Sequence, residues 1–108
     1  MLLTDVQFET LKNYCKIDQS FDNDVLETIV ESGAREISNA IDENKEPEFF
    51  IKDKRFLMAV MKYVYTDYYY RGTSSETMQF PITNATVQNV ISQLRAEYFE
   101  GGDEDENN

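Results

Sequence analysis

The sequence predicts an all-α fold, a small bundle of about four helices around one central apolar helix. The main observation is the run from Phe56 to Tyr65, in which only Lys62 is polar. This run is too long for one strand and is rich in Leu, Met and Ala, which favour helix. A helix that is apolar on all sides packs in the middle of a bundle. Lys62 and Asp67 interrupt the roughly 18 apolar residues that a membrane span requires, so we expect no membrane partner.

Length and composition limit the class of protein. The chain has 108 residues, which suits one helical domain at residues 1–99 followed by a flexible acidic tail at residues 100–108. It contains one cysteine, Cys15, and no histidine, so neither an internal disulfide nor a Cys/His zinc site is expected. The start of the chain has no basic region and no apolar run of secretory length, which favours a cytosolic protein.

The first predicted helix begins at a capping box, with Thr4 as N-cap and Gln7 three residues later. It ends near Lys16 and has an apolar side made of Val6, Leu11, Tyr14 and Cys15. The connector at residues 17–24 is polar after Ile17 apart from Phe21, which we expect to pin it to the core. Its acids, Asp18, Asp22 and Asp24, do not have the spacing of a calcium-binding loop. Asp22 or Asp24 is expected to cap the next helix.

A long amphipathic helix is predicted from Val25 to about Glu43, with Gly33 and Ala34 in its apolar stripe. These small residues predict the close approach of a neighbouring helix. Pro47 then breaks the helix, and the apolar residues 49–51 should lie on the bundle or on another subunit. Asp53 is expected to cap the central helix, which Gly72 ends.

The segment at residues 73–85 has no clear period, and we interpret it as an extended arm that docks on its own core or on a neighbour. Met78, Phe80 and Ile82 alternate with Gln79 and Pro81, which suits an extended arm or an edge strand. Pro81 argues against a central strand. Asn84 or Thr86 is expected to cap a last helix. The apolar face of that helix comprises Val87, Val90, Ile91, Leu94 and Tyr98.

The chain offers little material for catalysis, since it lacks histidine, a glycine-rich phosphate loop and a nucleophile beside a base. We therefore predict no enzyme, no cofactor and no metal site. Tyrosines crowd the end of the central helix, and Tyr65, Tyr68 and Tyr69 should lie on neighbouring positions. They form either an amphipathic lid on the bundle or an interface, which we favour. The candidate interface residues are Phe49, Phe50, Tyr65, Tyr69, Tyr70, Arg71, Met78, Phe80 and Ile82.

The plan resembles the small head–tail connector proteins (adaptor or head-completion proteins) of long-tailed bacteriophages and prophages. The resemblance covers roughly residues 3–98 and depends on the order of short pieces. In chain order these are Lys16-Ile17-Asp18, Asp24-Val25-Leu26, the stretch ESGAREIS, Tyr69-Tyr70-Arg71, Phe80-Pro81 and the closing ISQLR at residues 91–95. The aromatic connector at residues 49–51 and the acidic tail depart from the family pattern.

The resemblance implies a helical subunit made in the bacterial host cytoplasm and located in the virion, at the head–tail junction. Copies would form a ring under the portal protein, extend the DNA channel and dock the next connector or tail protein. DNA would pass without specific binding. The net charge of −11, of which residues 1–99 carry −6, fits a lumen lined by acids.

Two other functions compete with this one. The first is a small acidic inhibitor that mimics DNA and occupies the nucleic-acid site of an enzyme. It requires acids in a regular array on one helix face, whereas here Lys12, Lys16, Arg35 and Arg55 are interleaved with them. The second is a helical regulator that binds a partner helix through the tyrosines.

Overall fold

The computed structural model describes residues 2–70 and 85–99 of the chain. Its helices are α1 (Asp5–Cys15), α2 (Asn23–Ile41), α3 (Pro47–Phe50), α4 (Lys54–Tyr70) and α5 (Ala85–Leu94), which continues into a π-helical turn, η2 (Arg95–Phe99). No strand occurs in the described ranges, and the prediction of an all-α bundle is confirmed.

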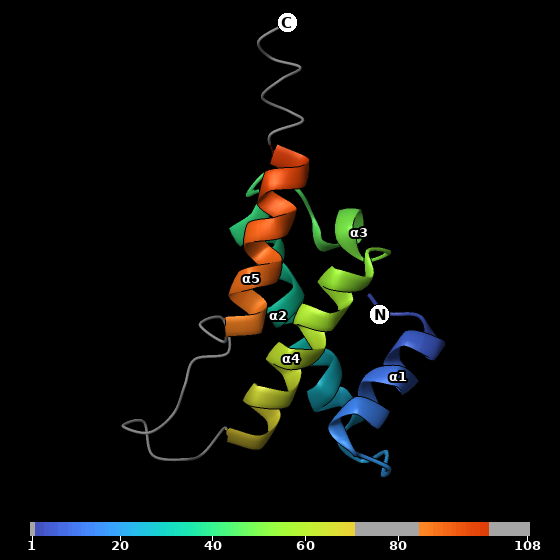
Figure 1. Ribbon diagram of the computed structural model, residues 1–108. Helices are drawn as coiled ribbons and strands as arrows, with labels where there is room; N and C mark the ends of the chain where they lie inside the picture. Colours follow the sequence, from blue (N-terminus) through green and yellow to red (C-terminus); the bar gives the residue numbers. More distant parts are fainter. Residues whose placement is uncertain (1, 71–84, 100–108) are drawn as a thin grey trace, which may run out of the picture.

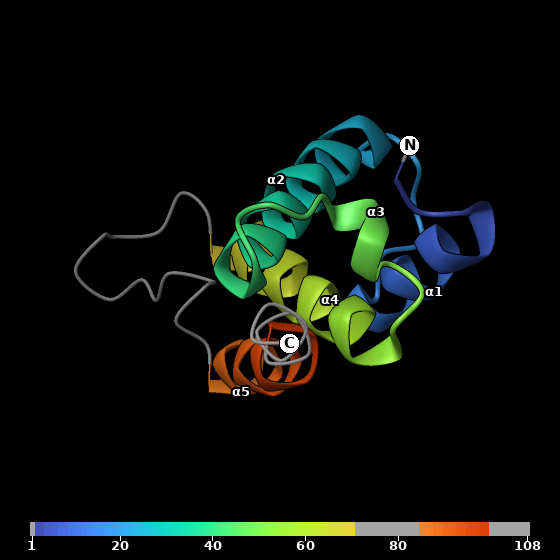
Figure 2. The ribbon, with the colours of Figure 1, turned by 90° about the horizontal axis from the view of Figure 1, so that it is seen from above.

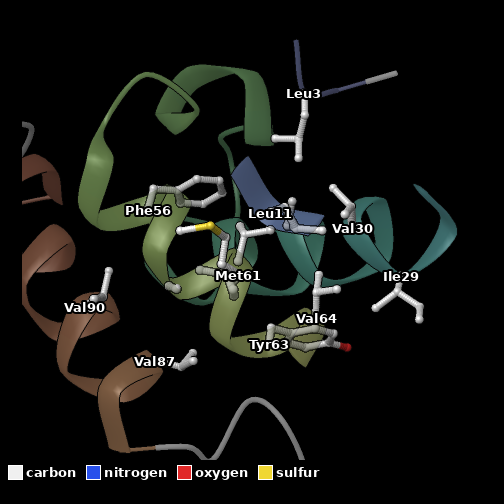
Figure 3. Packing of buried hydrophobic residues seen from close by; sticks show 14 of the residues in the cluster. Leu3, Leu11, Ile29, Val30, Phe56, Met61, Tyr63, Val64, Val87 and Val90 are labelled. Atoms are coloured by element: carbon white, nitrogen blue, oxygen red, sulfur yellow. The ribbon is translucent and has the colours of Figure 1, made fainter. Parts of the chain in front are cut away.

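Helix α4 is the centre of the bundle, as the apolar run predicted. It packs against α1, α2 and α5, and α2 and α5 also contact each other (Figures 1 and 2). Figure 3 shows side chains from these helices meeting around Phe56, Met61 and Val64. Val60 and Val64 are fully buried, so α4 contributes the middle of the hydrophobic core.

The predicted capping box at the start of α1 is present. The amide of Thr4 donates to Oε1 of Gln7 at 2.9 Å, and the amide of Gln7 donates to Oγ1 of Thr4 at 3.1 Å. The helix ends at Cys15, and its C-cap residue Lys16 adopts a left-handed conformation with φ of 60°. The expected place of Val6 on the apolar side is wrong, because its side chain is exposed and the buried face begins at Phe8.

The close approach predicted at Gly33 is confirmed. A Cβ at Gly33 would lie 2.5 Å from Cδ1 of Tyr63, so only glycine lets the tyrosine ring of α4 lie flat against α2. The hydroxyl of Tyr63 donates to Oε1 of Glu36 at 2.9 Å. This pair of contacts fixes how α2 and α4 face each other.

Residues 47–50 form a short helix, α3, instead of a plain connector. Pro47 is its first residue, where the missing N–H costs nothing. Phe50 is 1 % exposed and stacks on Phe56 with ring centroids 5.5 Å apart. The segment therefore lies on its own bundle, which is one of the two predicted possibilities. Asp53 caps α4 as predicted, since its Oδ1 accepts the amide of Arg55 at 2.9 Å.

Other capping predictions have different outcomes. Asp22 stands at the N-cap position of α2, but its side chain makes no capping hydrogen bond, and Asp24 lies inside the helix. Thr86 is the second residue of α5 and so does not cap it. Predictions for Gly72, the arm at residues 73–84, Asn84 and the tail at residues 100–108 lie outside the described residues.

The C-terminal turn η2 is attached to three parts of the bundle. Nη1 of Arg95 donates to the carbonyl of Ala40 at 2.8 Å, and Nη2 of Arg55 lies 2.9 Å from Oε2 of Glu97. The ring of Tyr98 packs edge-on against Phe49 and Phe50. Together these contacts hold η2 over α3 and the start of α4.

Candidate interaction surface

An aromatic cluster lies on the last turns of α4, where the sequence had placed neighbouring tyrosines. Tyr65 and Tyr69 are four residues apart, and their ring centroids are 4.9 Å apart. Tyr68 meets Tyr69 edge-on at 5.1 Å, and Tyr14 of α1 meets Tyr65 edge-on at 6.0 Å. Tyr65 and Tyr69 are 42 % and 44 % exposed, so two rings of the cluster are open to solvent.

Two hydroxyl groups of this cluster point back into the protein. Tyr69 donates to the backbone carbonyl of Cys15, and Tyr68 donates to Oδ2 of Asp22. Burial of the hydroxyl raises the pKa of Tyr69, with the neighbouring Cys15 and Tyr65 adding to the shift. The hydroxyls thus satisfy their hydrogen bonds inside, and the ring of Tyr69 is held rigidly at the surface.

The exposed surface of α4 continues from these tyrosines toward the start of the helix. Met58 is 38 % exposed, Lys54 is exposed, and Lys62 is partly exposed with its Nζ 5.5 Å from the ring centroid of Tyr14. These residues recur every three or four positions and share one side of the helix. We call this side the α4 stripe; it comprises Lys54, Met58, Lys62, Tyr65 and Tyr69.

The α4 stripe faces away from α2. Val60 and Tyr63, which point toward α2, lie on the other side of the helix. In Figure 1, α4 lies between α1 and α5 with α2 behind it. Its length from Lys54 to Tyr69 is roughly 22 Å. No residue of the stripe is acidic, although the chain carries a net charge of −11.

Among the predicted interface residues, the four whose side chains the structure describes do not form one surface. Phe49 is exposed, but it lies at the opposite end of α4 from the tyrosines, against Tyr98 and under the ammonium group of Lys45 at 4.5 Å. Phe50 is a core residue, so its prediction as an interface residue is wrong. The side chain of Tyr70 and all of Arg71, Met78, Phe80 and Ile82 lie outside the described residues.

The sequence reasoning missed three exposed or clustered residues. Phe21 was expected to pin the first connector to the core, but its side chain is 81 % exposed. Its neighbour Asp22 binds Tyr68, so Phe21 lies toward the same end of the bundle as the tyrosine cluster. Met58 and Tyr14 were not proposed as surface residues. The helical spacing of Met58 with Lys62 and Tyr65 was the signal that could have found it.

Cys15 and the acidic side chains are the other groups of the described residues that bear on possible chemistry. Burial raises the pKa of the Cys15 thiol to about 11, which keeps it protonated and unreactive at neutral pH. In residues 2–70 and 85–99, no three acidic or cysteine side chains come together in a way that could hold a metal ion. Over the same ranges, no helix is long and apolar enough to cross a membrane.

Comparison of this chain with protein-family models, with curated proteins and with solved structures gave no match. The function must therefore be inferred from the order of the helices and from the surface that they present.

Proposed function

We propose that this chain is a structural subunit of a head–tail connector, a ring located between the portal and the tail of a long-tailed bacteriophage. Its partners in this role are further copies of itself, the portal protein and the next connector or tail protein. The ring extends the DNA channel and performs no chemistry.

The observation that carries this proposal is the α4 stripe. A helical domain of this size gains stability by burying apolar and aromatic side chains, yet Met58, Tyr65 and Tyr69 remain at the surface of a rigid central helix. Tyrosine and methionine are enriched in the centres of protein interfaces. The ring of a tyrosine supplies contact area there at low entropic cost. The stripe therefore suits assembly better than it suits a free monomer.

Charge supports the same role. A ring of copies, each with a net charge of −11, repels the phosphate backbone of DNA that passes through it. Acids on the lumen wall would keep the DNA from binding during packaging and ejection. A ring whose lumen proved basic would contradict this part of the proposal.

DNA mimicry receives less support from the surface. The middle of the exposed face of α2 carries Thr28, Ser32 and Asn39, beside Arg35. A mimic of a DNA strand needs negative charges at regular spacing along such a face, and these uncharged and basic positions interrupt that spacing.

The test is reconstitution with a portal protein of the proposed phage or prophage, followed by electron microscopy. The proposal predicts a ring of this chain on one end of the portal. Tyr65→Ser combined with Tyr69→Ser should prevent the ring, whereas Val6→Ser, which alters an exposed apolar residue on α1, should leave it intact. Portal particles that never acquire density from the wild-type chain would contradict the proposal.

A further inference from the structure

A cleft on another side of the molecule has the opposite chemistry to the α4 stripe. It is lined by Leu2, Glu31, Arg35, Pro47 and Glu48, between the N-terminal segment, α2 and α3, and has a volume of about 290 Å³. Leu2 and Pro47 supply apolar surface. The guanidinium of Arg35 pairs with Glu46 at 3.0 Å, so the cleft retains the negative charges of Glu31 and Glu48.

The stripe and the cleft are complementary in charge. The stripe carries the positive charges of Lys54 and Lys62 beside the exposed side chains of Met58, Tyr65 and Tyr69. The cleft is lined mainly by polar groups, among them the carboxylates of Glu31 and Glu48, with Leu2 and Pro47 beside them. Interfaces use such complementary charges to select a partner and fix its orientation, while apolar groups supply the buried area.

One copy cannot bring these two surfaces together. Glu31 lies on α2, which covers the side of α4 that carries Val60 and Tyr63, whereas the stripe lies on the opposite side. Figure 2 shows α2 and α3 on one side of α4. The cleft is lined by residues of these two helices and of the N-terminal segment, and by none of the five stripe residues. The two surfaces can therefore meet only between copies.

We propose that the α4 stripe of one copy docks on the cleft of a second copy. Because two different surfaces meet, the contact is head-to-tail and repeats from copy to copy. Such a contact closes into a ring when its rotation closes, and otherwise grows into an open filament. This inference deepens the proposed connector function, on which the closed ring depends, by naming the surfaces that join the subunits.

The experiment measures self-association by sedimentation velocity up to about 1 mM. The wild-type chain should associate, and raising the salt from about 0.05 M to about 0.5 M should weaken the association about tenfold. A stripe variant (Lys54→Glu with Lys62→Glu) and a cleft variant (Glu31→Lys with Glu48→Lys) should each lose self-association. An equimolar mixture of the two should associate again, because each reversed surface then meets its complement.

Controls separate this contact from general charge effects. Glu9→Lys with Asp18→Lys changes the net charge as much as the cleft variant does, at exposed positions outside both surfaces, and should leave association within about twofold of wild type. Thermal unfolding of every variant establishes that it is folded. Deletion of residues 100–108 should also leave the association within about twofold.

Three outcomes would overturn the contact. These are a wild-type chain that stays monomeric throughout, variants that do not rescue each other, and association that begins only after residues 100–108 are deleted. The last outcome would mean that the acidic tail of the same chain, and not a second copy, binds the stripe. Rings on the portal without mutual rescue would retain the connector function and reject this contact. If the mixed variants associate into filaments but no ring forms on the portal, the contact is retained and the connector function is rejected.

Discussion

The two sides of α4 differ in solvent exposure more than its two halves do. The side that faces α2 is buried along the helix, from Phe56 through Val60 to Tyr63. The opposite side, the α4 stripe, is accessible along the same length, from Lys54 to Tyr69. Met58 in the first half is exposed, and Thr66 in the second half is buried. The sequence suggested a core half and an interface half, and the structure divides the helix by face.

This difference separates two tasks in one helix. The buried sides hold the bundle together through close packing, as at Gly33 and Tyr63. The stripe contributes little burial, but the hydroxyl of Tyr69 fastens its end to Cys15 of α1. Changes on the buried sides should therefore alter folding, and changes on the stripe should alter assembly.

The largest effect is expected from a charge on the buried side. Val60→Asp places a carboxylate where no water reaches, and should unfold the subunit or cost more than about 4 kcal/mol. Met58→Asp makes a comparable change two residues away on the stripe and should cost less than about 1 kcal/mol. Circular dichroism during thermal unfolding measures both. Equal losses would erase the distinction between the two sides.

A smaller loss is expected where α2 and α4 touch. Gly33→Ala forces the ring of Tyr63 to move, and should cost about 1–3 kcal/mol despite the better helix propensity of alanine. In a double-mutant cycle with Tyr63→Ala, the combined cost should fall below the sum of the single costs, because the clash disappears with the ring. Additive costs would mean that Gly33 and Tyr63 do not pack as described.

The buried side should also be sensitive to alkaline pH. Burial, followed by the hydrogen bond to Glu36, raises the pKa of Tyr63 from 10.0 to about 12. The neutral hydroxyl therefore stabilises the fold fully below pH 10, and this stability is lost as the pH rises through 12. Tyr63→Phe should lose less stability over that interval than wild type in urea unfolding. Parallel pH profiles for both proteins would contradict the assignment.

The smallest effects on stability are expected at the stripe. Tyr69→Phe removes the hydrogen bond to Cys15 and should cost about 0.5–1.5 kcal/mol. Tyr65→Ser should change the free energy of unfolding by less than about 1 kcal/mol, because its ring is already open to solvent. Both quantities come from denaturant titration. A loss from Tyr65→Ser as large as that from Gly33→Ala would place Tyr65 in the core.

The features that could be predicted from the sequence are those with a regular spacing of apolar or small residues along a whole helix. The central position of α4, the stripe of α2 and the close approach at Gly33 follow from spacing over many residues. Isolated apolar residues in connectors could not be placed in this way. Phe21 and Phe50 are both aromatic residues in short segments, yet one is exposed and the other is in the core.

The partners of the tyrosines were equally inaccessible to sequence reasoning. The carbonyl of Cys15 and the carboxylate of Asp22 are far from Tyr69 and Tyr68 in the sequence, and only the packed fold brings them together. The cleft opposite the stripe likewise joins residues from the N-terminal segment, α2 and α3. No local pattern marks such a site.

The central claim, that the α4 stripe is an assembly surface, is tested most directly by hydroxyl-radical footprinting of dilute and concentrated protein. Met58, Tyr65 and Tyr69 should be oxidised more slowly at the high concentration, while Val6, exposed on α1 outside both surfaces, should react equally in both. Protection of Val6 with unchanged oxidation of the three stripe residues would contradict the claim.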